Sequence, residues 1–179
     1  LRQGRGVVKD ETKAVQWYRK AAEQGEVDAQ ASLGHMLREG RGVVKDEAQA
    51  VQWYRKAAEQ GNAGAQIALG NMLRLGRGVV ENEAQAVQWY RKAAEQGDVD
   101  AQARLGNMLA LGRGVVKDEA QAVHWYRKAA EQGDVDSQAF LGNMLQEGRG
   151  VVKDEEQAVQ WFRKAAEQGH ALAQFGLVL

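Results

Sequence analysis

The sequence contains no cysteine and no proline, and it has few of the side chains on which most catalytic and metal sites depend. Without cysteine, disulfide bonds, thiolate metal ligands and cysteine nucleophiles are excluded. Without proline, the turns have to be made by glycine, of which there are 21. The serine, threonine and histidine residues are Thr12, Ser32, Ser137, His35, His124 and His170. They fall at different positions of the repeat described below, so the sequence predicts no catalytic centre, no cofactor and no metal site.

An excess of charge of one sign is also missing. Lysine plus arginine and aspartate plus glutamate each number 24, which gives a formal net charge of zero. Proteins that bind nucleic acids or anionic membranes usually carry a basic surface, so neither is an expected partner. No apolar run has the length of a membrane span, so membrane insertion is not expected either.

The chain instead contains a repeat of constant length. Trp17, Trp53, Trp89, Trp125 and Trp161 are spaced 36 residues apart, and the segment AVQWYRKAAEQG occurs unchanged at 50–61 and 86–97. A period between about 20 and 50 residues is typical of stacked-repeat proteins, in which each unit packs only against its neighbours. The period therefore decides the fold class before any single element is considered.

Each repeat predicts two amphipathic helices. In the first, helix A, the apolar residues Ala29, Leu33, Met36 and Leu37 have helical spacing. In the second, helix B, the apolar arc is Ala50, Val51, Trp53, Tyr54, Ala57 and Ala58. The expected N-caps of helix B are Asp46, Asn82, Asp118 and Asp154, each with glutamine three residues later as in a capping box. Glycine is expected at the left-handed position after helix B, at Gly61, Gly97 and Gly133.

Glycine also occurs inside helix A, at Gly34, Gly70, Gly106 and Gly142. Glycine costs about 1 kcal/mol relative to alanine in a helix interior, so its recurrence predicts that two helix backbones approach closely there.

The loop between the two helices has the sequence GRGVVKD or, once, GRGVVEN. Phosphate-binding glycine loops follow a strand, whereas this loop follows a helix and recurs in every repeat, so we interpret it as structural. Its two valines are expected to fill the gap between the helix ends.

The predicted fold is an all-α, right-handed solenoid of stacked antiparallel helix pairs, forming one domain over residues 1–179. Its elements are a helix B at 11–24, helix pairs at 28–60, 63–96, 99–132 and 135–168, and part of a helix A at 170–179. Because both ends of the sequence cut through a repeat, we expect the chain to be part of a longer array that associates head to tail through uncapped ends. The apolar residues expected to be exposed there are Val15, Trp17, Tyr18, Leu172, Phe175, Leu177 and Val178.

The repeat resembles the Sel1-like repeat, a relative of the tetratricopeptide repeat. The resemblance rests on Ala-x-x-x-Leu-Gly at 29–34 and 101–106, on Gly40, Gly42 and Val43 of the loop, and on the helix B segment 50–61. It covers essentially the whole chain. It implies a right-handed α-solenoid that serves as an adaptor or scaffold for protein complexes, as in endoplasmic-reticulum degradation machinery and in bacterial secreted or signalling proteins. Some cysteine-rich bacterial members are linked to β-lactam binding, but this chain lacks their cysteines.

The histidines and aromatic residues have structural interpretations. His124 lies on the polar arc of helix B and His170 at a helix start, so surface or capping roles are expected for the histidines. The tryptophans and tyrosines could form an aromatic platform for a ligand, but their place in the apolar arc of helix B favours the core.

The polar face of helix A is the candidate binding surface, because substitutions between repeats concentrate there. Either this face is simply solvated and free to vary, or it carries ligand specificity. Apolar residues on it, such as Phe140, Leu75 and Leu111, are what a peptide groove would show. The predicted ligand face comprises Ser32, His35, Arg38, Asn71, Arg74, Leu75, Arg104, Asn107, Leu111, Phe140 and Asn143.

Three functions remain open on this basis. The favoured one is a non-catalytic scaffold that binds a protein or peptide. The second is a secreted or periplasmic binder of a small molecule or cell-wall fragment. The third is a consensus-designed or recently amplified array without a specific ligand.

Overall fold

The computed structural model describes residues 10–171 and residue 173, and these residues form helices and loops without a strand. The predicted all-α architecture of stacked helix pairs is therefore confirmed. The helices of the described part are α1 (Glu11–Glu23), α2 (Val27–Glu39), α3 (Glu47–Glu59), α4 (Ala63–Leu75), α5 (Glu83–Glu95), α6 (Val99–Leu111), α7 (Glu119–Glu131), α8 (Val135–Glu147) and α9 (Glu155–Glu167). The expected exposed residues Leu172, Phe175, Leu177 and Val178 lie outside the described residues, as does most of the predicted helix 170–179.

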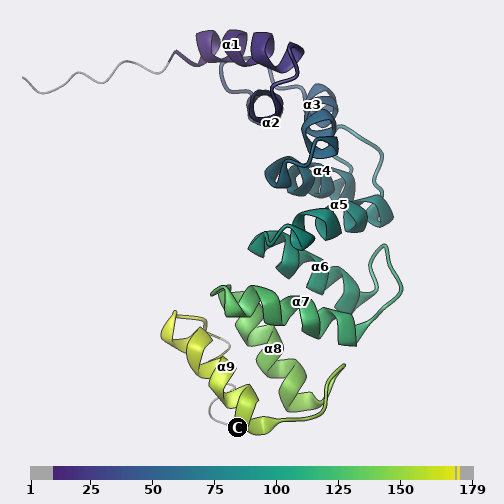
Figure 1. Ribbon diagram of the computed structural model, residues 1–179, viewed down its shortest axis with the longest axis vertical. Helices are drawn as coiled ribbons and strands as arrows, with labels where there is room; N and C mark the ends of the chain where they lie inside the picture. The colour runs from purple at the N-terminus through teal and green to yellow at the C-terminus, as the bar shows by residue number, and fades with distance from the viewer. Residues whose placement is uncertain (1–9, 172, 174–179) are drawn as a thin grey trace, which may run out of the picture. The chain divides into compact units, whose positions relative to one another are not determined.

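The chain forms two compact units, residues 1–81 and residues 82–179. Unit 1 contains α1 to α4 and unit 2 contains α5 to α9. Within each unit, every helix packs against the helix that follows it in the chain, as the ribbon shows (Figure 1). The even-numbered helices are the predicted A helices and the odd-numbered ones are the predicted B helices.

Helix B is capped as expected, but by a different arrangement of hydrogen bonds. The Asp46 side chain accepts the backbone N–H of Gln49 at 2.8 Å, which satisfies one free donor of the first turn. In a capping box the Gln49 side chain would accept the backbone N–H of Asp46. Here the Gln49 amide donates to Asp46 Oδ2 at 2.7 Å, because the Asp46 N–H already donates to the carbonyl of Leu37 at 2.9 Å.

A buried glutamine connects neighbouring helices, which the sequence analysis missed. Gln30 of α2 is 4% exposed, and its amide donates to the carbonyl of Ala22 in α1 at 3.2 Å. Its oxygen accepts from the side chain of Gln60, next to the end of α3, at 2.8 Å. Gln102 and Gln138 make the same two kinds of bond in unit 2. Each buried amide thereby has partners for both its donor and its acceptor, as buried polar groups require.

The glycine inside helix A faces an aromatic ring, and the predicted close approach of two backbones is wrong. A Cβ added to Gly106 would lie 2.9 Å from ring carbons of Tyr126 in α7. The same holds for Gly34 against the ring of Tyr54, at 2.9 Å. The glycine therefore leaves space for the tyrosine ring of the following helix B. Both tyrosines, Tyr54 and Tyr126, are 3% exposed.

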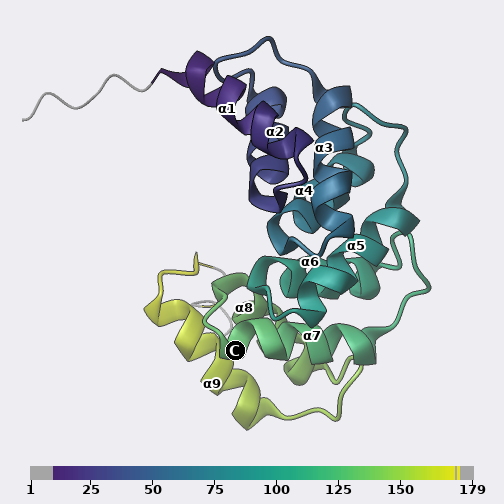
Figure 2. The same cartoon turned by 45° about the horizontal axis from the view of Figure 1, so that its top comes forward.

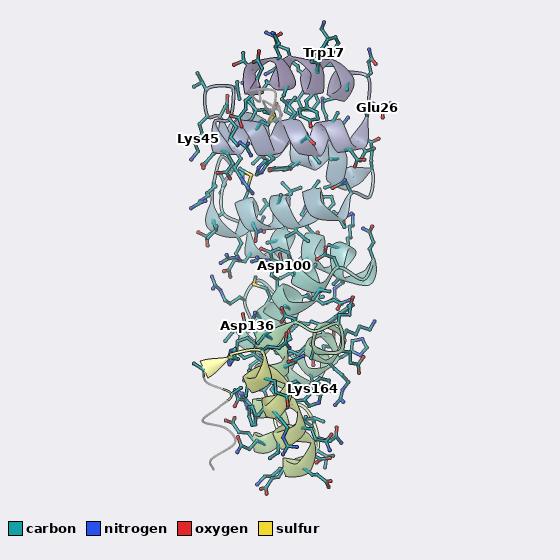
Figure 3. The ribbon with its side chains drawn as sticks, turned by 90° about the vertical axis from the view of Figure 1, so that its left-hand side faces the viewer. Trp17, Glu26, Lys45, Asp100, Asp136 and Lys164 are labelled. Atoms are coloured by element: carbon teal, nitrogen blue, oxygen red, sulfur yellow. The ribbon has the colours of Figure 1, made fainter. Side chains whose placement is uncertain are left out.

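The tryptophans are less buried than their place in the apolar arc predicts. Trp125 is 7% exposed, but Trp53 and Trp89 are half-buried and Trp17 is 68% exposed on the outer side of α1 (Figure 3). The tryptophan position borders the polar side of helix B, where the lysine three residues later lies over the ring, as Lys56 does over Trp53 at 4.2 Å.

The expectation of exposed apolar residues on α1 is partly wrong. Val15 is buried, at 5% exposure, because α1 packs against α2. Trp17 and Tyr18 are exposed, at 68% and 39%. Head-to-tail association stays a prediction.

The long loop is fixed to the preceding helix B by its second glycine. Gly114 has φ 64°, and a Cβ there would collide with the backbone carbonyl of Glu83 in α5. Only the first valine of the loop is half-buried, as at Val115, while the second, Val116, is 86% exposed. The expectation that both valines fill the gap is therefore wrong for the second one.

We predict that Gly106→Ala destabilises the protein although alanine is the better helix former. Overpacking against the Tyr126 ring should cost about 1–3 kcal/mol, more than the about 1 kcal/mol gained in helix propensity. Gly106→Leu should be worse still. Gly64→Ala is the control, because Gly64 is helical and meets only the side chain of its own N-cap at 3.5 Å, so this change should stabilise. Denaturant titration measures both, and an equal stabilisation by the two alanines would contradict the ring contact.

We also predict that Gly114→Ala destabilises more than Gly133→Ala. Both glycines have positive φ, at 64° and 97°, so both variants pay about 1–2 kcal/mol for a left-handed alanine. Only Gly114 meets a backbone carbonyl, whereas nothing lies within 4 Å of a Cβ at Gly133. Thermal and denaturant unfolding should separate the two variants, and equal losses would show that conformation alone requires the glycine.

Candidate functional site

A groove of about 490 Å³ in unit 1 is lined by side chains of α1 to α4 and of the loops beside them. Figure 2 shows the ribbon of these four helices. Small or apolar residues line part of it, namely Ala14, Ala31, Met36, Gly64, Ala65 and Ala68. The polar and aromatic residues in its lining are Glu11, Tyr18, Ser32, His35, Arg38, Arg41, Tyr54 and Asn62. Ser32, His35 and Arg38 are the members of the predicted ligand face that line this groove.

Helical spacing places these three residues on one side of α2, since each lies three residues from the next. Arg38 Nη2 donates to His35 Nδ1 at 3.2 Å, and Arg38 Nε donates to Glu39 at 2.7 Å. The guanidinium also lies over the ring of Tyr54, 6.0 Å from its centroid. The hydrogen bond and the charge of Arg38 hold the pKa of Glu39 below its usual value. Arg38 is thus fixed by contacts with an imidazole, a carboxylate and an aromatic ring.

The contact with Arg38 also defines the chemistry of His35. A guanidinium can only donate, so Nδ1 of the neutral imidazole is the acceptor and Nε2 carries the hydrogen. Ser32 and His35 both line the groove, because they lie three residues apart on the same side of α2. In this arrangement His35 cannot act as a base toward Ser32, because its accepting nitrogen is already occupied.

Tyr54 contributes a protonated hydroxyl to the groove. Burial raises its pKa to about 12, an effect that the charge of Arg38 opposes. At neutral pH the Tyr54 hydroxyl therefore keeps its hydrogen and remains available as a donor. The sequence analysis assigned Tyr54 to the core; it is buried and also lines the groove.

In unit 2, the corresponding face of α6 and α8 carries a polar and aromatic cluster. The Tyr126 hydroxyl donates to Asn107 Oδ1 at 2.8 Å. Burial raises the pKa of Tyr126, which keeps the hydroxyl protonated and able to donate. The ring of Phe140 lies 5.3 Å from that of Tyr126, and Phe140 is 41% exposed. Tyr126 thus contacts both the Asn107 amide, which it orients, and the solvent-exposed ring of Phe140.

Arg104 adds a half-buried guanidinium to α6. It donates from Nε to Asp100 Oδ2 at 2.8 Å, one turn earlier in the same helix. Burial by itself disfavours its charge, but the hydrogen bond and charge of Asp100, together with Tyr90, leave the pKa of Arg104 raised. The cation is therefore held in place on the predicted face.

The other members of the predicted face are less closely grouped. Asn71 and Arg74 are half-buried on α4, Leu75 and Leu111 are exposed as the last residues of α4 and α6, and Asn143 is exposed on α8. The exposure of the two leucines, at 47% and 65%, agrees with their predicted place on a solvent-accessible face.

The remaining histidines and Ser137 have structural surroundings. His124 is exposed, with its ring edge against Trp125 at 5.2 Å between centroids. His170 Nδ1 accepts the backbone N–H of Ala173 at 3.2 Å, as a capping residue does. Ser137 is fully buried, and its hydroxyl has no hydrogen-bond partner among the described residues. The other ring nitrogen of His170, Nε2, lies 3.3 Å from Asp136 Oδ1.

A hydrogen-bonded ion pair in the lining of the groove links residues that the sequence analysis did not connect. Arg41 of the loop donates from Nε to Glu11 at the start of α1, at 3.0 Å, and Arg113 does the same to Glu83 at 2.8 Å. The arginine of the Gly-Arg-Gly loop and a glutamate in the first turn of helix B recur 30 residues apart. That recurrence of opposite charges is the signal from which the pair could have been predicted.

A second hollow of about 480 Å³ lies over α3, lined by Ala48, Val51, Gln52, Arg55, Lys56, Glu59 and Gly78. Apart from Val51, its lining residues are exposed. It offers long, exposed side chains in place of the buried aromatic and hydrogen-bonded polar groups of the first groove.

Over the residues that the structure describes, no group of three or more histidine, aspartate or glutamate side chains is arranged to hold a metal ion. None of the helices in this part of the chain combines the length and apolar character that a membrane crossing requires.

Comparison with known proteins places these features in a family. Solved structures similar to this chain include a protective antigen of uropathogenic Escherichia coli with an SLR fold, 44% identical, with a TM-score of 0.94. The match covers 97% of this chain but 37% of that antigen. A Sel1 repeat protein from Oxalobacter formigenes is 43% identical, with a TM-score of 0.83, covering 94% of this chain and 69% of the other. None of the curated proteins matches the chain.

A more distant similarity extends to cysteine-rich protein B of Helicobacter pylori, which is 33% identical with a TM-score of 0.58, over 75% of this chain and 97% of that one. Sel1 repeats match residues 1–26, 27–62, 63–98, 99–134 and 135–170. These boundaries follow the 36-residue period of the tryptophans. With glycines, aromatic rings and loop all repeating in that frame, the chain belongs to the Sel1 repeat family.

Proposed function

We propose that this protein is a non-catalytic scaffold that binds a segment of another protein, or a peptide, through the outward side of its A helices. Sel1 repeats commonly form protein-interaction modules. The observation that carries the proposal is the groove of unit 1, which is lined by Ser32, His35 and Arg38 of the predicted ligand face together with Tyr18 and Tyr54. Aromatic side chains and arginine are the residue types most enriched at the energetic centres of protein interfaces.

The construction of the groove supports binding. Alanine and glycine in its lining leave space for side chains of a ligand. Arg38 is already held by Glu39 and His35, so little conformational entropy is lost when a ligand contacts it. Such preorganisation favours affinity.

The same groove gives no support for catalysis. His35, the histidine of the groove, accepts from Arg38 and so lacks a free basic nitrogen for Ser32. A nucleophile without an adjacent base is a weak one. We therefore assign no reaction to the site.

A binder of a small molecule or cell-wall fragment is the second candidate. One observation favours it: a volume of about 490 Å³ lies within the range of about 300–1,000 Å³ that is common for small-molecule sites. The groove lies open to solvent, whereas such ligands are mostly enclosed by their pockets, so we place this function second.

The test is selection of 12-residue peptides from a random phage library on the immobilised chain, followed by calorimetry with the purified peptides. Arg38→Ala should weaken a groove-binding peptide at least about tenfold, as loss of an interface arginine commonly does. Arg55→Ala, in the second hollow, is the matched control and should leave the affinity within about twofold. Circular dichroism confirms that both variants fold.

Three results would contradict the proposal. Peptides that respond to Arg55→Ala and not to Arg38→Ala would place binding over α3. Failure to enrich any peptide, together with binding of a muropeptide, would favour the second candidate. Absence of binding to either class would leave an array without a specific ligand.

A further inference from the structure

His35 of α2 and Asn107 of α6 occupy the same position of the repeat, and each has its acceptor atom engaged by the protein itself. Arg38 Nη2 donates to His35 Nδ1 at 3.2 Å, and the Tyr126 hydroxyl donates to Asn107 Oδ1 at 2.8 Å. The partners differ, one from the same helix and one from the following helix B. In each unit by itself, an internal donor thus fixes the orientation of the side chain.

What remains for a ligand is an N–H group in both cases. A neutral imidazole that accepts at Nδ1 carries its hydrogen on Nε2, and an amide that accepts at Oδ1 has two hydrogens on Nδ2. His35 is exposed and lines the groove of unit 1, while Asn107 is half-buried and, like the exposed Phe140, contacts Tyr126. The ligand must therefore provide hydrogen-bond acceptors at these two positions.

Main-chain carbonyls of an extended peptide are acceptors of this kind. The carbonyls of a helical segment are already used by its own i to i+4 hydrogen bonds, apart from those of its last turn. A peptide in extended conformation has free carbonyls, and its side chains alternate in direction, so one can face the A helix surface next to a bound carbonyl. The charge balance of the chain gives no reason to prefer a nucleic acid backbone as the source of acceptors.

We propose that His35 in unit 1 and Asn107 in unit 2 are peptide-binding donors, and that each binds a main-chain carbonyl of an extended peptide. This rests on the proposed function and names its ligand as an extended segment bound through its backbone. In unit 2, the ring of Phe140 makes an apolar contact with the peptide side chain next to the carbonyl that Asn107 binds. In unit 1, the small residues Ala31 and Ala68 leave room for the peptide side chain next to the carbonyl that His35 binds. Tyr126 and Arg38 are positioning residues for the two donors.

The first experiment changes the donors and leaves their surroundings intact. Asn107→Asp keeps an oxygen for the Tyr126 hydroxyl but replaces the outward NH₂ by an acceptor, so peptides bound in unit 2 should lose at least about fivefold in affinity, as expected for one lost hydrogen bond. For unit 1, His35→Leu removes the donor, whereas His35→Asn introduces the residue found at this position in the next three repeats and should preserve binding. The probes are the peptides selected from the phage library.

The second experiment tests whether the acceptor is a main-chain carbonyl. Each peptide is resynthesised with single amide-to-ester replacements, which weaken one carbonyl acceptor at a time. At one position the ester should lower the affinity of the peptide for the wild-type chain about threefold or more. The same ester should not lower the affinity for the variant that lacks the donor, Asn107→Asp or His35→Leu, because the hydrogen bond between donor and carbonyl is already lost there. Tyr126→Phe should weaken the same peptides although Tyr126 touches no ligand. Phe162 already occupies the equivalent position in α9, so this variant should fold.

The possible results separate the two proposals. Peptides that need Arg38 but ignore His35→Leu and Asn107→Asp would leave the scaffold function standing and overturn the donor assignment. Ester effects of the same size on wild type and variants would also overturn it, because the sensitive carbonyl would then lie elsewhere. If the chain enriches no peptide, both proposals fail together. Loss of binding in His35→Leu, rescue in His35→Asn and a position-specific ester effect would establish the donors.

Discussion

The contact between an aromatic ring and a glycine is the constraint on which most of this structure depends. The ring of Tyr126 lies so close to Gly106 that a methyl group there would reach within 2.9 Å of its carbons, and Tyr54 has the same relation to Gly34. A buried ring removes a large apolar area from water, and its stabilisation depends on close contact on both faces. Glycine makes that contact possible, so the loss of helix propensity at Gly106 is compensated by packing in the next helix.

The same contact links the fold to the candidate binding surface. Because the ring of Tyr126 is held against α6, its hydroxyl reaches Asn107 on the outward side of that helix. A tyrosine at this position therefore serves two purposes, since its ring joins two helices and its hydroxyl orients an amide. In α9 the equivalent Phe162 keeps the first role and lacks the second. The fold tolerates that change, which indicates that the hydroxyl is not needed for packing.

Much of the fold could be predicted from the sequence, because its period and its apolar spacing are both local properties. The helical wheel predicts which side of α3 is apolar, but it does not say which neighbour covers each position. For that reason the burial of Val15 was not predicted, although Trp17 is exposed as expected, and the buried role of Gln30 went unnoticed. Gln30 looks like any polar helical residue until the carbonyl of Ala22 and the amide of Gln60 are placed around it.

The candidate site shows the same limit. The variable face of helix A could be recognised from substitutions between repeats, since neutral drift and ligand specificity both change exposed residues. The groove could not be predicted, because it brings together Tyr54, which the sequence assigns to the core, and Tyr18, which was expected at an exposed end. Nor could the donor character of His35 be predicted, because it follows from a single hydrogen bond with Arg38.

These observations suggest how a repeat with such a constant core can acquire specificity. Positions that join helices are tied to their partners, since Gly106 lies against the Tyr126 ring of α7 and Gln102 is hydrogen-bonded to Ala94 of α5 and to Gln132 after α7. A change at either position disturbs the contact between helices. The position of Ser32 is more variable, and there the repeats carry side chains as different as those of Arg104 and Phe140. A fixed donor at the neighbouring position would bind any peptide backbone equally well. Discrimination between peptides would then come from the variable position beside it, where serine, arginine or phenylalanine favours a different ligand side chain. On this basis the backbone contact supplies affinity that is independent of sequence, and each repeat can alter its preference without altering the packing that holds the array together.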